Sequence, residues 1–226
     1  MKKRSRKKNK QNLAAIISLI LVFVSFLAAV KILSNVATQH FDDEIIVCLD
    51  AGHGGSDVGA VAKDGKRYEK NDNLKLTLKV RDELERMGIK TVLTRDADET
   101  VELKDRCKTA NKKRCDLFVS IHRNSSANGT GFEAWISKNE KENEKSVASD
   151  MLKALSQVTG LDNRGVRNGY RDKTSRNYYV NANTNMPSIL LECGFITSEE
   201  DNKVFDEEID VMANEIAKVI YDAVQN

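Results

Sequence analysis

The stretch IIVCLDAGHGG, residues 45–55, decides the fold class of this 226-residue chain. Its apolar half, residues 45–49, is followed at once by Asp50 and a glycine-rich turn. A short apolar run bounded by a turn signal is typical of a buried strand in a parallel sheet. Glycines allow the chain to turn tightly, so the strand is expected to end beside His53, a residue type that can bind a metal ion.

Strand and helix signals alternate along the rest of the chain. Apolar residues at helical spacing predict helices over residues 73–87, 101–112, 145–158 and 211–224. Short apolar runs predict strands over residues 89–94, 117–121, 132–136 and 189–193. Residues 161–177 have the polar composition of a loop. The alternation predicts one α/β domain, residues 44–226, with a mostly parallel twisted sheet flanked by helices.

The N-terminal segment differs in composition from this domain. Residues 1–12 form a basic flank, an apolar run follows to residue 30, and residues 34–43 form a linker. The run would extend about 27 Å as a helix, close to the hydrocarbon thickness of a bilayer. The sequence therefore predicts a single-pass signal-anchor helix over residues 13–33 in the cell membrane, with the following domain extracytoplasmic. A signal peptide cleaved near residues 34–37 is the alternative and would give a secreted protein.

Charge is distributed unevenly between these two parts. Residues 1–31 hold eight of the 36 basic residues and no acidic one, which leaves 28 basic against 34 acidic residues in the remainder. A nucleic-acid-binding domain normally shows a basic excess, so the composition argues against a nucleic-acid partner. The four cysteines show no C-x-x-C spacing, which argues against a thiolate zinc site.

Residues suited to metal binding or acid–base chemistry follow three of the predicted strands. His53, His122 and Glu192 occupy these positions, and Glu69 lies just before the helix predicted from residue 73. The carboxyl ends of parallel strands meet at one edge of a sheet, so these side chains are expected to gather there.

Two imidazoles and one carboxylate are a common ligand set for catalytic zinc, with a fourth position left for water. His53, Glu69 and His122 would form such a set, and Glu192 could exchange protons with the water and the departing amine. The glycine-rich turn lacks the patterns of phosphate-binding loops. Spacing alone leaves open that the histidines are ordinary core or surface residues.

From residue 45 to its C-terminus, the chain resembles the zinc-dependent N-acetylmuramoyl-L-alanine amidases of the Amidase_3 type. Six blocks carry the resemblance: LDAGHGG at 49–55, EK at 69–70 with NL at 73–74, LTRD at 93–96, RxxxAN at 106–111, DLFVSIHxN at 116–124 and NMPSILLECGF at 185–195, where x is a position that does not count toward the match. The resemblance implies that His53, Glu69 and His122 bind one zinc ion and that Glu192 is catalytic.

The resemblance also implies the substrate, which is the peptidoglycan amide between N-acetylmuramic acid and the L-alanine of the stem peptide. Similarity to spore-cortex amidases implies a role in cell-wall or spore-cortex remodelling, with an accessory or activating protein as a candidate partner. A zinc peptidase acting within the stem peptide and an inactive wall-binding domain are the alternatives.

Several further residues carry expectations of their own. We expect Asn73 to cap a helix, and Lys70 and Arg95 to be surface or ion-pair groups. Arg123 stands where the family often has a small residue and is expected to alter contacts beside the metal. Ser198 replaces a common asparagine and is expected to change a local cap.

Overall fold

The computed structural model describes residues 18–33, 44–141, 143–170 and 176–225, in two units, Met1–Glu44 and Ile45–Asn226. In the first unit, residues 18–33 form a helix whose apolar side chains are exposed. Among the described residues, no helix combines the length and the apolar character needed to cross a membrane. The predicted basic flank, linker and first part of the anchor fall in residues 1–17 and 34–43, which lie outside the described residues.

A six-stranded sheet forms the centre of the second unit, with strand order β2-β1-β3-β6-β4-β5. Its strands are β1 (Ile46–Ala51), β2 (Lys90–Leu93), β3 (Leu117–Asn124), β4 (Phe132–Ile136), β5 (Asn163–Asn168) and β6 (Ser188–Phe195). All neighbouring strands run parallel except β4 and β6. The prediction of one α/β domain with a mostly parallel sheet is therefore confirmed.

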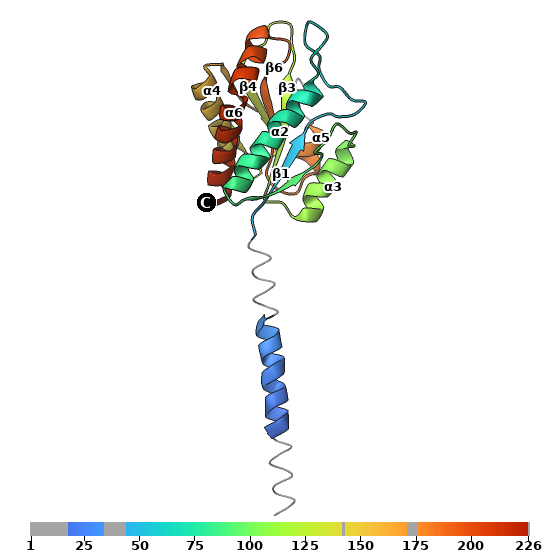
Figure 1. Ribbon diagram of the computed structural model, residues 1–226, viewed down its shortest axis with the longest axis vertical. Coiled ribbons are helices and arrows are strands. Elements are labelled where there is room, and N and C mark those ends of the chain that lie inside the picture. Colours follow the sequence, from blue (N-terminus) through green and yellow to red (C-terminus); the bar gives the residue numbers. More distant parts are fainter. Residues whose placement is uncertain (1–17, 34–43, 142, 171–175, 226) are drawn as a thin grey trace, which may run out of the picture. The chain divides into compact units, whose positions relative to one another are not determined.

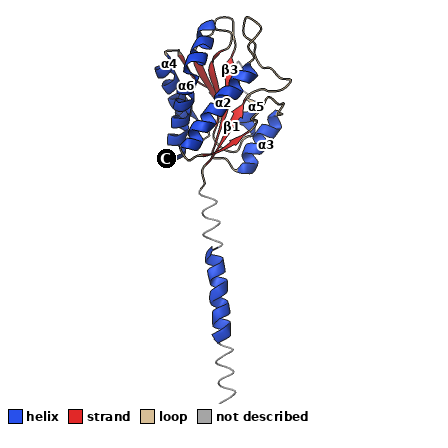
Figure 2. Ribbon diagram, in the orientation of Figure 1, coloured by secondary structure: helices blue, strands red, loops and turns tan. Residues whose placement is uncertain are grey.

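Helices cover both faces of the sheet (Figures 1 and 2). One face packs against α2 (Glu69–Arg86), α4 (Glu144–Thr159) and α6 (Glu199–Gln225), and the other against α3 (Leu103–Lys113) and α5 (Tyr179–Asn183). Apolar residues at helical spacing, such as Leu76, Val80 and Leu84 of α2, are fully buried in the first of these cores.

The alternation of side chains along each strand decides which of them face the side of the sheet that carries the polar residues. On β3, Val119 and Ile121 belong to the core under α2, α4 and α6, whereas Phe118 belongs to the core under α3 and α5. Successive side chains of a strand point to opposite faces, so Ser120 and His122 share the face of Phe118. The polar residues at the carboxyl ends of the central strands therefore lie on the side of α3 and α5.

Several elements differ from the sequence prediction, among them the short helix α5, where no element was predicted. Residues 163–168, predicted as loop, form the edge strand β5, whose side chains are exposed or half-buried and so give no apolar signal. The last helix begins at Glu199, twelve residues before the predicted start at residue 211. Ser198 caps this helix as expected, because its Oγ accepts a hydrogen bond from the Asp201 amide at 3.2 Å and donates to Asp201 Oδ1 at 2.8 Å.

All four cysteines are free and buried. They pack as small apolar side chains in the two cores.

Candidate metal centre and active site

The turn after β1 is held by two arginine side chains. Arg95 donates to the carbonyls of Ala51 and Gly52 at 2.8 and 2.9 Å. Arg106 donates to the carbonyls of Ala51 and His53, each at 2.7 Å. These bonds fix His53 in a left-handed conformation with φ of 61°, which is uncommon for a residue with a Cβ atom.

Arg95 is 2% exposed, so its prediction as a surface or ion-pair group was wrong. The five N–H donors of a guanidinium group suit it to satisfying several buried carbonyls at once. Lys70 does form the predicted ion pair, with Asp98 at 2.7 Å.

A buried carboxylate supports the same turn from inside the sheet. Asp50 accepts hydrogen bonds from Arg106 at 2.7 Å, Thr94 at 2.6 Å and Ser120 at 2.5 Å. Burial by itself raises the pKa of Asp50, but Arg106 and the two hydroxyl groups outweigh it and hold this pKa below its usual value. Asp50 is therefore a stable anion under the turn.

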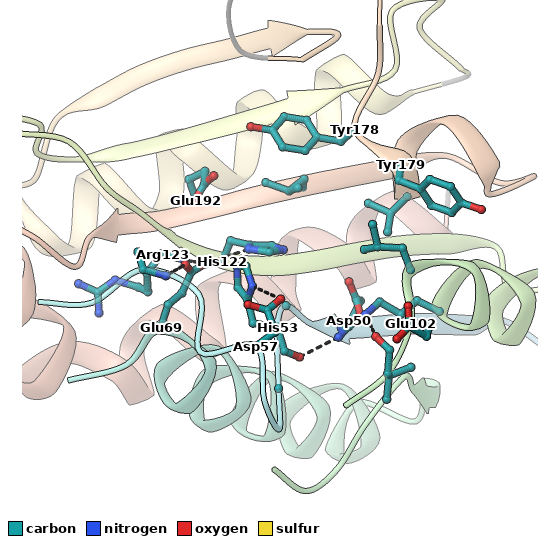
Figure 3. A pocket seen from close by; sticks show the side chains of 18 of the residues that line it. Asp50, His53, Asp57, Glu69, Glu102, His122, Arg123, Tyr178, Tyr179 and Glu192 are labelled. Carbon is teal, nitrogen blue, oxygen red and sulfur yellow. Dashed lines mark hydrogen bonds and ion pairs between the residues drawn. The ribbon is translucent and has the colours of Figure 1, made fainter. Parts of the chain in front are cut away.

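His53, Glu69 and His122 converge at the edge of the sheet (Figure 3). Glu69 Oε1 lies 3.2 Å from His53 Nε2 and 2.9 Å from His122 Nδ1. One ligand atom from each residue lies within 4.8 Å of the other two. Zinc ligands at about 2.1 Å from the ion in a tetrahedral site are roughly 3.4 Å apart, so this donor set fits such an ion.

Neighbouring groups orient these three side chains. Asp57 Oδ2 lies 2.8 Å from His53 Nδ1. This contact orients the imidazole so that Nε2 faces Glu69 and His122. Glu69 also accepts hydrogen bonds from the Ala60 amide at 2.8 Å and from Asn73 Nδ2 at 3.3 Å. Asn73 is buried inside α2, so its predicted role as a helix cap was wrong: the helix begins four residues earlier, at Glu69 itself.

The cluster shifts the protonation of its own members. Burial lowers the pKa of His53, but the hydrogen bonds with Glu69 and Asp57 outweigh it and raise this pKa to about 9. Burial raises the pKa of Glu69, yet His122 and His53 together hold it well below its usual range. The centre of the cluster therefore favours positive charge, as a cation site requires.

Glu192 lies on β6 directly opposite His122 of β3 in the parallel register, and it is 5% exposed. A cavity of about 970 Å³ is lined by all four sequence-predicted site residues and by Tyr170, Tyr178 and Tyr179. Figure 3 shows Glu192 on the strand next to His122. The structure thus brings the predicted residues together around one cavity.

Arg123, the residue after His122, differs from expectation. Its side chain is buried, pairs with Asp72 at 2.6 Å, and lies 4.3 Å from the centroid of the Phe205 ring. Only its backbone N–H reaches the cluster, donating to Glu69 Oε1 at 3.2 Å. The side chain therefore stabilises the packing of α2 and α6 behind the site instead of changing contacts beside the metal.

Sequence reasoning missed the supporting residues Asp57 and Arg106 and the three tyrosines of the cavity. Asp57 could have been found, since it follows His53 by four residues in the same turn. Arg106 belongs to one of the blocks that resemble the amidases, but no local sequence pattern around it indicates that its side chain is buried.

The close packing of Gly52 gives a testable prediction. A Cβ atom at this position would lie 2.2 Å from His122 Cε1. We expect Gly52→Ala to displace the imidazole and to weaken zinc binding about 10- to 100-fold, measured by competition with a chelator. Gly65→Ala is the control for a loss of stability without a clash at the metal centre, because a Cβ atom there meets nothing within 4 Å and only the φ of 74° opposes the substitution. Equal zinc affinity in the wild type and Gly52→Ala would contradict the expected displacement.

Proteins of known structure share this fold. The catalytic domain of CwlV, an N-acetylmuramoyl-L-alanine amidase from Bacillus (Paenibacillus) polymyxa, matches with a TM-score of 0.71 and 37% identity, over 80% of this chain and 98% of that one. The CwlD amidase from Clostridioides difficile, solved in complex with the GerS lipoprotein, matches with a TM-score of 0.69 and 30% identity, over 80% of this chain and 97% of that one.

Curated sequences give the same result. The uncharacterized protein YqiI of Bacillus subtilis is 38% identical over 157 residues, which cover 69% of this chain and 72% of YqiI. The sporulation-specific N-acetylmuramoyl-L-alanine amidase of B. subtilis is 34% identical over 157 residues, 69% of this chain and 58% of that protein. The chain thus spans little more than half of that amidase.

The Amidase_3 family model, described as N-acetylmuramoyl-L-alanine amidase, matches residues 47–226. This range covers nearly all of the α/β unit, including His53, Glu69, His122 and Glu192. The chain belongs to the Amidase_3 family of N-acetylmuramoyl-L-alanine amidases.

Proposed function

We propose that this chain hydrolyses the peptidoglycan amide between N-acetylmuramic acid and the L-alanine of the stem peptide, with one zinc ion as its cofactor. One observation carries the proposal: the His53–Glu69–His122 cluster and Glu192 line the same cavity, with His122 and Glu192 on neighbouring strands. Membership of the amidase family supports the reaction, and the cluster contains the nitrogen and oxygen donors that zinc prefers.

A zinc ion, when bound, supplies Lewis acidity toward a carbonyl group and a water molecule. His53, Glu69 and His122 would hold the ion, and Asp57, 2.8 Å from His53 Nδ1, would keep His53 in the tautomer that presents Nε2 to it. Glu192 takes the proton from the attacking water and returns it to the leaving nitrogen of L-alanine. Its position on the strand beside His122 supports this role.

The test is hydrolysis of purified peptidoglycan by the purified chain, with and without stoichiometric zinc, followed by mass spectrometry of the released fragments. We expect free stem peptides that begin with L-alanine, and only in the presence of the metal. Cleavage within the peptide would identify a zinc peptidase instead. The absence of any product while zinc is bound, both for the chain alone and with the accessory protein proposed below, would contradict the proposed function and favour a wall-binding role.

We further propose that residues 13–33 anchor the chain in the cell membrane and place the catalytic domain outside. The basic flank supports this orientation, and so do the exposed apolar side chains of the helix over residues 18–33. Cell fractionation with protease treatment of protoplasts tests it. We expect a membrane-bound chain whose domain is digested from outside, whereas a shortened chain in the medium would identify a cleaved signal peptide.

We also propose that the chain acts with an accessory protein and that it remodels the spore cortex. The CwlD amidase was solved with a lipoprotein partner, and a sporulation-specific amidase is among the relatives. Deletion of this chain in a spore-forming host is expected to change the muropeptides of the cortex, as measured by chromatography. Unchanged cortex muropeptides would assign the chain to vegetative wall turnover.

A further inference from the structure

A second glutamate lies beside Glu192 and has no part in the proposed mechanism. Glu133 of β4 is opposite Glu192 of β6 in the antiparallel register, so both side chains lie on the same face of the sheet. His122, Glu192 and Glu133 therefore form a row across three neighbouring strands. Glu133 is 5% exposed, and a carboxylate buried to this extent requires partners.

Three side chains provide these partners. Trp135 Nε1 donates to Glu133 Oε1 at 2.9 Å. Arg167 and Arg164, both on β5, approach Glu133 Oε2 with their Nε atoms at 2.9 and 3.4 Å. Each guanidinium group also lies near an aromatic ring, Arg167 at 5.9 Å from the Trp135 centroid and Arg164 at 5.0 Å from the Phe195 centroid. The two arginines are therefore held in place over the sheet.

This cluster has more positive than negative charge. One carboxylate faces two guanidinium groups, whose side chains are 45% exposed in Arg167 and 35% exposed in Arg164. Among the described residues, Arg167 forms an ion pair only through Nε, to Glu133, so the two terminal nitrogens of its guanidinium group can contact a ligand. A planar fork of N–H donors matches the two oxygens of a carboxylate.

We propose that Arg164 and Arg167 bind a carboxylate of the stem peptide while its first amide lies at Glu192. This inference rests on the proposed function and identifies the residues that would determine the substrate preference of the enzyme. Neighbouring strands are about 4.8 Å apart, and an extended peptide advances about 3.4 Å per residue. A peptide that runs from Glu192 across β4 toward β5 therefore brings a carboxylate on its second residue to the arginine pair.

Two synthetic substrates test the inference: N-acetylmuramoyl-L-alanyl-D-glutamate with a free α-carboxylate, and the same compound with an α-carboxamide. We expect the zinc-loaded wild-type chain to prefer the acid about tenfold in kcat/KM, mainly through KM. Arg167→Ala should remove this preference by raising KM for the acid, and Arg167→Lys should keep part of it. The ratio of the two rates comes from one preparation, so it does not depend on the fraction of correctly folded enzyme.

Arg86→Ala is the matched control, because this exposed arginine lies at the far end of α2, about 26 Å along the helix from Glu69. It should leave both rates unchanged. Equal wild-type rates on the two substrates, or an equal loss on both in Arg167→Ala, would overturn the carboxylate site. Hydrolysis of neither substrate by the wild type would contradict the proposed function instead.

Discussion

Glu192→Gln is expected to lower the rate of amide hydrolysis about a thousandfold while the domain stays folded and keeps its metal. Glutamine has nearly the same shape, so it fits the buried position on β6. Its amide group cannot accept a proton from the attacking water, which removes the general base. The measurement is kcat on a defined muramoyl peptide, together with zinc content and the thermal unfolding midpoint.

Glu207→Gln is the control for this replacement, since the Glu207 side chain is 59% exposed and belongs to α6, away from the cavity. We expect it to retain the wild-type rate. A wild-type rate in Glu192→Gln would remove this residue from the mechanism. Loss of zinc from Glu192→Gln would show that Glu192 is a ligand and not the base.

Glu69→Ala should have the second largest effect, loss of both zinc binding and activity. Glu69 Oε1 is the atom that both histidines approach, and it brings the only negative charge of the three-residue ligand set. Two neutral imidazoles remain after the substitution, and we expect the affinity for zinc to fall more than about a hundredfold. Elemental analysis after dialysis and titration against a zinc-binding dye measure this loss.

Glu85→Ala on the same helix is the matched control, because Glu85 is exposed and its contact is with Thr91. This variant should bind one zinc ion per chain. If Glu69→Ala also binds one zinc ion with wild-type affinity, the ligand set is different from the one inferred.

The sequence predicted the central strands because both faces of these strands are covered. All eight residues of β6 are buried, and five of the six in β1, so each appears as an apolar run in the sequence. The edge strand β5 lacks this signal, since none of its residues is buried. The five-residue helix α5 is too short to show a helical period.

The position of the site could be predicted, but the groups that support it could not. Residues that follow parallel strands must meet at one edge, which was sufficient for His53, His122 and Glu192. Arg95 and Arg123 are buried by hydrogen bonds and ion pairs with distant parts of the chain, whereas composition alone suggests surface residues. Their environment depends on tertiary contacts that no local pattern encodes.

The arginines that hold the turn after β1 have a consequence for the order of events during folding. They follow the carbonyls that they bind by 44 positions, for Arg95 and Ala51, and by 53 positions, for Arg106 and His53. We therefore expect the turn to become ordered only after β2 and α3 have docked onto β1. Because the chain itself supplies these donors, we expect the domain to fold first and to capture its ion afterwards, unlike small domains that fold only around a metal.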